Sequence, residues 1–212
     1  PIYQSPANLI VSRAMKWTVA LLVFVVACAP GGRQTPGDDD SGGGGGGGGG
    51  GADGGTDGCS AAAKLIYVVD ENNNLAQFNA GTKTFTQLGV LNCPAGDNPQ
   101  TGQPANPFSM AVDRNATAYV LYEDNAIYKV DTTQPGLPCT ATGWTTSSDS
   151  ALQEFDMGYS TDSPGSDTDH LFVAGGQDLS SSAAATTSEL ATIDTTAFTS
   201  QHIGPVVGWP EL

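Results

Sequence analysis

A strand-rich unit that occurs three times is the feature that most constrains the fold of this chain. Its clearest copy lies between Pro107 and Asp131, with the sequence PFSMAVDRNATAYVLYEDNAIYKVD. β-Branched and aromatic residues fill three short runs, at 108–113, 117–123 and 126–131, while Arg, Asn and Asp fill the gaps between the runs. This pattern predicts a tight antiparallel meander of short strands.

The other two copies lie on either side, from Lys64 to Cys93 and from Phe155 to Trp209. Each copy has an aromatic anchor in one strand and a polar anchor at the end of the next: Tyr67 and Asn79, Tyr119 and Asp131, Phe172 and Asp194. Tyr67 and Tyr119 are 52 residues apart, and Asn79 and Asp131 are also 52 residues apart. The third copy is longer, and Ser/Ala/Thr-rich inserts near 178–188 and 160–169 account for the excess, as expected of loops.

The turn residues and the Met-Ala-Val-Asp signature at 110–113 resemble β-propeller repeats of the NHL and YVTN kind. This resemblance implies an all-β domain at 61–212, a partial β-propeller of about three blades at 64–105, 106–150 and 151–212. The first repeat lacks its inner strand, because Ala61 to Ala63 stand in its place. Propellers usually have four to eight blades, so we expect a fragment of a longer propeller, truncated at the C-terminus.

The N-terminal region predicts export. The apolar run at 17–27 follows Met15 and Lys16 and is only about 16 Å long as a helix, too short for a membrane span. Residues 15–28 therefore form a signal peptide, and the sequence VVAC ending at Cys28 resembles the lipobox of bacterial lipoproteins. The resemblance implies a lipid anchor on Cys28, with outer-membrane or cell-surface localisation because position 29 is not Asp. Ordinary signal cleavage is the alternative.

Two further segments precede the folded part. Residues 1–14 are either sequence upstream of a start at Met15 or an extended signal-peptide n-region. Residues 29–60 include ten consecutive glycines from Gly42 to Gly51 and predict a disordered Gly/Asp-rich linker, since glycine has the most backbone entropy to lose. The signal, this tether and the PFSMAVDR stretch together resemble a group of uncharacterised propeller lipoproteins of Gram-negative bacteria.

The charge balance argues against nucleic acid as a partner. From Ser60 onwards there are seventeen Asp and Glu against four basic residues, a formal net charge of about −13. Such a surface repels phosphate backbones. An acidic, well-solvated extracellular surface is the expected consequence.

The cysteines after the signal peptide are disulfide candidates, because an exported protein matures in an oxidising compartment. Cys93 and Cys139 each follow the polar anchor of adjacent repeats, so we predict that they pair. Cys59 is then left over, or pairs in place of one of the two. Zinc is disfavoured by the absence of any Cys-x-x-Cys or closely spaced His pair.

The sequence offers little catalytic chemistry, and we predict no cofactor and no catalytic residue. The only histidines are His170 and His202, and no Gly-x-Ser-x-Gly nucleophile elbow occurs. Asp162, Asp167 and Asp169 form a weak calcium candidate, since the full Ca²⁺-loop signature is absent. We interpret Asp113 and Asp131 as turn-capping residues.

These features favour a surface-anchored lipoprotein whose propeller-like domain is a non-enzymatic binding or scaffold module. The expected partners are the membrane, through the anchor on Cys28, and a protein, peptide or glycan ligand. The alternative is a calcium-dependent propeller hydrolase or lactonase, which needs inward-facing carboxylates from several repeats.

Overall fold

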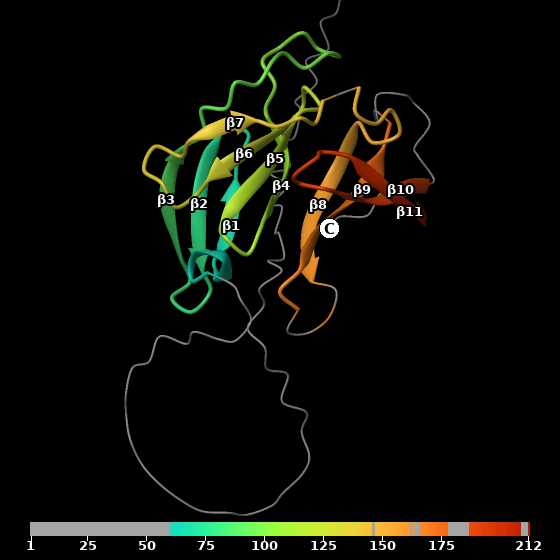
Figure 1. The fold of residues 1–212 in the computed structure, drawn as a ribbon. Helices are drawn as coiled ribbons and strands as arrows, with labels where there is room; N and C mark the ends of the chain where they lie inside the picture. The colour runs from blue at the N-terminus through green and yellow to red at the C-terminus, as the bar shows by residue number, and fades with distance from the viewer. Residues whose placement is uncertain (1–59, 146, 162, 164–165, 178–186, 209–211) are drawn as a thin grey trace, which may run out of the picture.

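The computed structural model describes residues 60–145, 147–161, 163, 166–177, 187–208 and 212. This part of the chain is all-β, as predicted, and has three antiparallel sheets (Figure 1). One turn of 3₁₀ helix, η1 (Ala62–Lys64), precedes the first strand. No helix in the described ranges is long and apolar enough to cross a membrane. The predicted signal peptide, Cys28, Cys59 and the glycine tract lie outside the described residues.

Each sheet is a meander of strands that follow one another in the chain. The first sheet contains β1 (Ile66–Val69), β2 (Asn74–Asn79) and β3 (Thr84–Val90). The second contains β4 (Pro107–Val112), β5 (Thr117–Tyr122), β6 (Ile127–Asp131) and β7 (Cys139–Ala141). The third contains β8 (Glu154–Thr161), β9 (Asp169–Gly176), β10 (Thr187–Ile193) and β11 (Ser200–Val207).

The strands predicted from the clearest repeat are confirmed to within a residue or two, as β4, β5 and β6. Strand β7 was not predicted, because its three residues, Cys139–Ala141, are too few to form a visible pattern. Both predicted loop inserts are shorter than expected, because the neighbouring strands extend into them. Strand β8 continues to Thr161, and β10 already begins at Thr187.

The pairing registers are equivalent in the three sheets. The aromatic anchors occupy equivalent ladder positions, with Tyr67 opposite Gln77, Tyr119 opposite Lys129 and Phe172 opposite Thr192. The polar anchors, Asn79, Asp131 and Asp194, cap equivalent turns. The Oδ1 atom of each accepts a backbone N–H from the residue two positions ahead, and Asn79 and Asp194 also accept one from three positions ahead. Turn chemistry and strand pairing therefore repeat together.

A β-bulge also recurs at the outer strand of the first and third sheets. The register shifts between Leu75 and Ala76 and again between Leu190 and Ala191. The residues opposite are Gly89, with φ 156°, and Gly204, with φ 152°. These backbone angles favour glycine, and an L side chain there would be strained.

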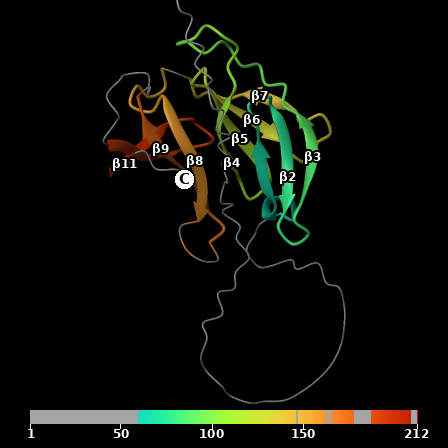
Figure 2. The same ribbon diagram turned by 180° about the vertical axis from the view of Figure 1, so that it is seen from behind.

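The second sheet lies between the other two and is buried on both faces (Figures 1 and 2). One apolar cluster joins it to the first sheet, and a separate cluster joins it to the third. Trp144, just after β7, is 1% exposed and packs edge-on against Phe155 of β8, with ring centroids 5.6 Å apart. The hydroxyl of Ser109 on β4 accepts the backbone N–H of Met157 on β8 at 3.0 Å, so the first strands of the two sheets are tied directly.

Candidate functional site

The predicted disulfide between Cys93 and Cys139 is confirmed. It joins the segment after β3 to the first residue of β7, with a Cα–Cα distance of 4.9 Å and a sequence separation of 46. The bridge therefore links the first sheet to the outer strand of the second. In the chain-entropy account, closing a loop of that length stabilises the fold by about 4 kcal/mol.

Two of the three calcium candidates contact an arginine. The Arg114 guanidinium, from the turn between β4 and β5, lies 3.3 Å from Asp169 through Nε and 3.9 Å from Asp167 through Nη1. Its Nη2 also donates to the backbone oxygen of Ser166 at 3.2 Å. Asp162 lies outside the described residues. The guanidinium thus supplies the positive charge for these two carboxylates.

The two contacts of Arg114 differ in environment. The side chains of Arg114 and Asp169 are 11% and 17% exposed, whereas that of Asp167 is 90% exposed. Water screens the ion pair between Arg114 and Asp167. The more buried pair between Arg114 and Asp169 is therefore the one that ties the β4–β5 turn to the start of β9. Within the described ranges, no group of three or more His, Cys, Asp or Glu side chains is arranged to hold a metal ion.

A polar cluster that the sequence did not reveal joins the loop after β7 to the edge strand β11. His202 Nε2 lies 2.8 Å from Asp149 Oδ2, and His202 Nδ1 lies 3.2 Å from Glu189 Oε1 on β10. Ser200 donates its hydroxyl to the same Asp149 oxygen at 2.6 Å. We call these four residues the His202 clasp. No spacing in the sequence indicates it, because Asp149 and His202 are 53 residues apart.

Neighbouring groups shift the pKa values of His202 and Asp149 in opposite directions. Partial burial acts to lower the pKa of His202, but hydrogen bonds and charges from Asp149 and Glu189 outweigh this effect and raise the pKa. Burial likewise acts to raise the pKa of Asp149, but hydrogen bonds from Ser200, the Ala151 amide and His202 outweigh it and lower the pKa. Both shifts favour the charged forms of His202 and Asp149.

The clasp contains Ser, His and Asp, yet its connections differ from those of a hydrolase triad. A triad needs the serine hydroxyl hydrogen-bonded to the imidazole that takes its proton. Here the Ser200 hydroxyl bonds to Asp149, and both nitrogens of His202 face carboxylates. This arrangement ties the loop after β7 to the third sheet, and neither nitrogen of His202 bonds to Ser200.

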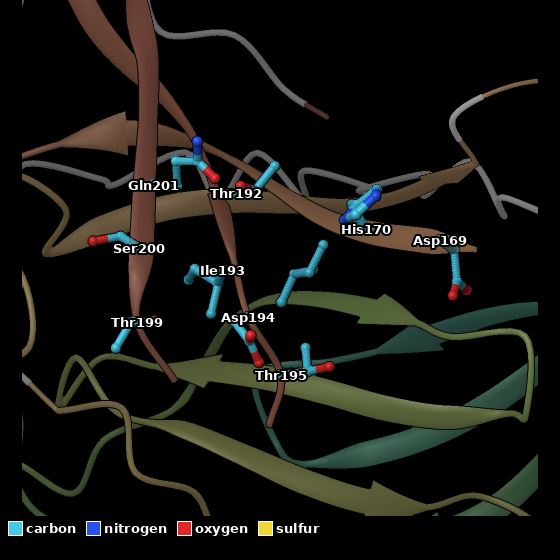
Figure 3. Close-up of a pocket in the computed structure, with 10 residues that line it drawn as sticks. Asp169, His170, Thr192, Ile193, Asp194, Thr195, Thr199, Ser200 and Gln201 are labelled. Carbon is cyan, nitrogen blue, oxygen red and sulfur yellow. The ribbon is translucent and has the colours of Figure 1, made fainter. Parts of the chain in front are cut away.

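A pocket of about 410 Å³ lies beside the clasp, where β9 begins, β10 ends and β11 begins (Figure 3). Figure 3 shows Ile193 in the middle of the labelled residues. Most of the lining is polar; the residues are Asp169, His170, Leu171, Thr192, Ile193, Asp194, Thr195, Thr199, Ser200 and Gln201. Asp169 connects the pocket to Arg114, and Ser200 connects it to the His202 clasp.

The lining sets what the pocket can bind. Three threonine hydroxyls and the Gln201 amide can both donate and accept hydrogen bonds. The Ser200, Asp169 and Asp194 side chains already bond to Asp149, Arg114 and turn amides, respectively. Leu171 and Ile193 close the floor of the pocket and belong to the apolar core, with 1% and 3% exposure. Such a mixture suits a neutral ligand with several hydroxyl groups, since the two carboxylates disfavour an anion.

The other predicted residues have structural places. Asp113 accepts the amides of Asn115 and Thr117 through Oδ1, which confirms its turn-capping role. Burial raises the pKa of Asp113, and the charge of Asp169 adds to this effect. Asp131 caps its turn through the Thr133 amide. His170 stands at the second position of β9 and lines the pocket.

The comparisons with known proteins give no family to which the chain can be assigned: no protein-family model matches it, and no curated protein matches it significantly.

Proposed function

We propose that this chain is a lipid-anchored, non-enzymatic binding module whose ligand is a neutral glycan held in the pocket at the ends of β9, β10 and β11. The observation that carries the proposal is the polar lining of this pocket, four of whose residues, Thr192, Thr195, Thr199 and Gln201, carry hydroxyl or amide groups. Sugar hydroxyls match these groups because they both donate and accept hydrogen bonds. The acidic surface, with a net charge of about −13 from Ser60 onwards, favours neutral over anionic glycans.

We also propose that the three sheets are blades of a β-propeller. Two of the sheets have four antiparallel strands in a meander, and the equivalent registers and turn caps relate all three. The first strands of successive blades approach one another in a propeller, and β4 and β8 do so through Ser109 and Met157. Ligands of propellers frequently bind at the ends of the strands, where this pocket lies, although fold alone does not set function.

The anchor follows from the lipobox resemblance at Cys28. A lipid-modified cysteine attaches a folded domain to a membrane without a spanning helix. The glycine-rich tether at 29–60 then holds the domain away from the lipid surface; about 30 flexible residues have a root-mean-square span of about 30 Å. Mass spectrometry of the mature protein should find acyl chains on Cys28, and an unmodified N-terminal cysteine would refute the anchor.

Glycan binding is tested with the full chain carrying Cys28→Ser, so that lipid does not interfere. A panel of neutral oligosaccharides is screened on an array, and the best binder is titrated by calorimetry. We expect Thr199→Val and Gln201→Ala each to weaken binding about 3- to 20-fold, since each removes one or two hydrogen bonds.

Matched controls make the outcome decisive. Thr84→Val and Gln87→Ala repeat the two substitutions on exposed residues of the first sheet, outside this pocket, and should leave affinity unchanged. The proposal would be contradicted if the control variants lost as much affinity as the pocket variants, or if no oligosaccharide on the panel bound. Hydrolysis of a lactone or glycan that stops when calcium is chelated would instead favour the enzymatic alternative.

A further inference from the structure

The turn between β10 and β11 supplies part of the pocket wall. Three of its residues, Asp194, Thr195 and Thr199, line the pocket (Figure 3). Within the turn, the backbone N–H of Phe198 donates to the Asp194 carbonyl at 2.7 Å, and the N–H of Asp194 donates to the Thr199 carbonyl at 3.0 Å. Phe198 therefore belongs to the same turn, although it does not line the pocket itself.

Phe198 has a backbone conformation that is unfavourable for a bulky residue. Its φ is 53°, in the left-handed region that glycine and asparagine adopt most readily. Lys83 and Leu137, which also shortly precede the last strands of their sheets, have φ values of 56° and 48°. The Lys83 side chain is exposed, so this conformation belongs to the turn and does not depend on side-chain packing. At Phe198 the contacts of the ring offset the strain.

The Phe198 side chain reaches the end of the second sheet. It packs on the apolar cluster between the second and third sheets, beside Gly143, which lies just after β7. A Cβ atom at Gly143 would lie 3.5 Å from Phe198 Cβ and 3.7 Å from its Cδ2, which is van der Waals distance. The N–H of Thr142 donates to the Ile127 carbonyl at 3.1 Å and so holds this segment on β6. Phe198 thus fastens the pocket turn to the second sheet.

Leu137 makes a similar contact one sheet earlier. Its Cδ1 atom lies 3.2 Å from the position of a Cβ atom at Gly89 on β3, and its side chain packs in the apolar cluster between the first and second sheets. Leu137 therefore ties the segment before β7 to the first sheet, as Phe198 ties the segment before β11 to the second. Neither Leu137 nor Gly89 lines the pocket, so Leu137 is a structural counterpart of Phe198 without a binding role.

We propose that Phe198 is a positioning residue of the ligand pocket, whose ring holds the three pocket residues of the β10–β11 turn in the geometry that binds the ligand. This inference rests on the function proposed for the pocket. Without the ring contact, the strained turn would populate other conformations, and the apparent affinity falls in proportion to the fraction of molecules that keep the binding geometry. The hydrogen bond from Ser200 to Asp149 acts on the first residue of β11, whereas Phe198 acts on the turn.

Calorimetry of the full chain carrying Cys28→Ser tests the proposal, with the best binder among neutral cello-, malto- and xylo-oligosaccharides as the probe. We expect Phe198→Ala to weaken binding about 10-fold, as if the turn kept the binding geometry in about a tenth of the molecules. Phe198→Leu keeps an apolar side chain on Gly143 and should recover most of the affinity. Leu137→Ala is the matched control: both alanine variants should lower the melting temperature by roughly 5–10 °C, but Leu137→Ala should leave the affinity unchanged.

Hydrogen exchange gives a readout that needs no ligand. The amides of Asp194 and Ala197 are hydrogen-bonded within the turn, and under native conditions they should exchange about 10-fold faster in Phe198→Ala but at the parent rate in Leu137→Ala. Equal affinity losses in the two alanine variants, or unchanged affinity or exchange in Phe198→Ala, would overturn the proposal. If no oligosaccharide binds the parent chain, the function proposed for the pocket fails, and the exchange rates alone decide whether Phe198 holds the turn.

Discussion

Asp149 Oδ2 and His202 Nε2 lie 2.8 Å apart and join the loop after β7 to the edge strand β11. The contact ties the segment that connects the second and third sheets to the third sheet, and Glu189 on β10 lies 3.2 Å from the other ring nitrogen. An ion pair in this place couples the packing of two repeats to the protonation of one imidazole.

This coupling predicts a pH-dependent stability. The pKa of His202 is raised above its ordinary value of 6.5, so the clasp contributes fully below about pH 6.5 and its contribution is lost as the pH rises through the folded-state pKa. The pKa of Asp149 is lowered from 3.8, so its contribution is present above that value and is lost as the pH falls through the folded-state pKa. The His202 side chain is 44% exposed, which limits the effect to about 0.5 kcal/mol.

Urea unfolding of the parent chain and His202→Gln measures this effect. The difference between the two should be largest near pH 5.5 and should shrink above neutrality. The NMR titration midpoint of His202 should lie above 6.5 and fall in Asp149→Asn. A stability difference that does not change with pH would contradict the ion-pair account.

The disulfide should be a main source of stability. Replacing Cys93 and Cys139 together by Ser should lower the free energy of unfolding by about 4 kcal/mol, because the unfolded chain regains the entropy of a loop whose ends are 46 residues apart. Thermal melting with and without dithiothreitol checks the result. Reductant should lower the melting temperature of the parent chain and leave that of the double variant unchanged.

The two carboxylates beside Arg114 should differ in importance. Asp169→Ala leaves a guanidinium that is 11% exposed without its nearer partner and should cost about 1–3 kcal/mol. Asp167→Ala removes a side chain that is 90% exposed and should cost less than about 0.5 kcal/mol. Chemical denaturation measures both. If the loop held Ca²⁺ instead, both variants would lose a calcium-dependent rise in melting temperature.

Asn73 and Asn125 occupy the same turn position in successive repeats, with φ of 64° and 60°, but should respond differently to Gly. The side-chain oxygen of Asn73 accepts the Tyr122 hydroxyl at 2.6 Å. Asn73→Gly should therefore cost roughly 1–2 kcal/mol, because that largely buried hydroxyl loses its acceptor.

Asn125→Gly serves as the comparison. Its Oδ1 is buried and has no hydrogen-bond partner among the described atoms. Glycine also tolerates positive φ, so this variant should stay within about 0.5 kcal/mol of the parent. Equal losses at the two sites would show that the turn conformation, and not the Tyr122 contact, determines the cost. Burial raises the pKa of Tyr122 to about 12, so the hydroxyl remains a donor throughout the measurement.

The repeat could be predicted because its signals are local. Strands β4 to β6 and the capping residues Asp113 and Asp131 follow from alternating residue types and from side chains that bond amides two to four residues away. The spacing of the aromatic and polar anchors placed the equivalent strands correctly. Gly89 and Gly204, the glycines opposite the bulges, are a further correspondence between the first and third copies. The prediction from anchor spacing did not use it.

The candidate site could not be predicted in the same way. Its residues come from β9, β10, β11 and the turn between β10 and β11, and the adjoining clasp adds Asp149 from the loop after β7. None of these residues stands at a spacing that identifies a partner. Asp169 illustrates the difficulty, since an Asp-rich loop suggests a cation, whereas its partner is Arg114, 55 residues earlier.

The sequence by itself determined the all-β class, the strand boundaries of the clearest copy and the Cys93–Cys139 pairing, because residue alternation, turn chemistry and cysteine position are written along the chain. Only the tertiary structure decided which faces are covered. Ile66 and Val120 are both apolar strand residues, yet one is partly exposed and the other fully buried. Burial depends on whether another sheet packs there, and that is a property of neighbours in space, not of neighbours in sequence.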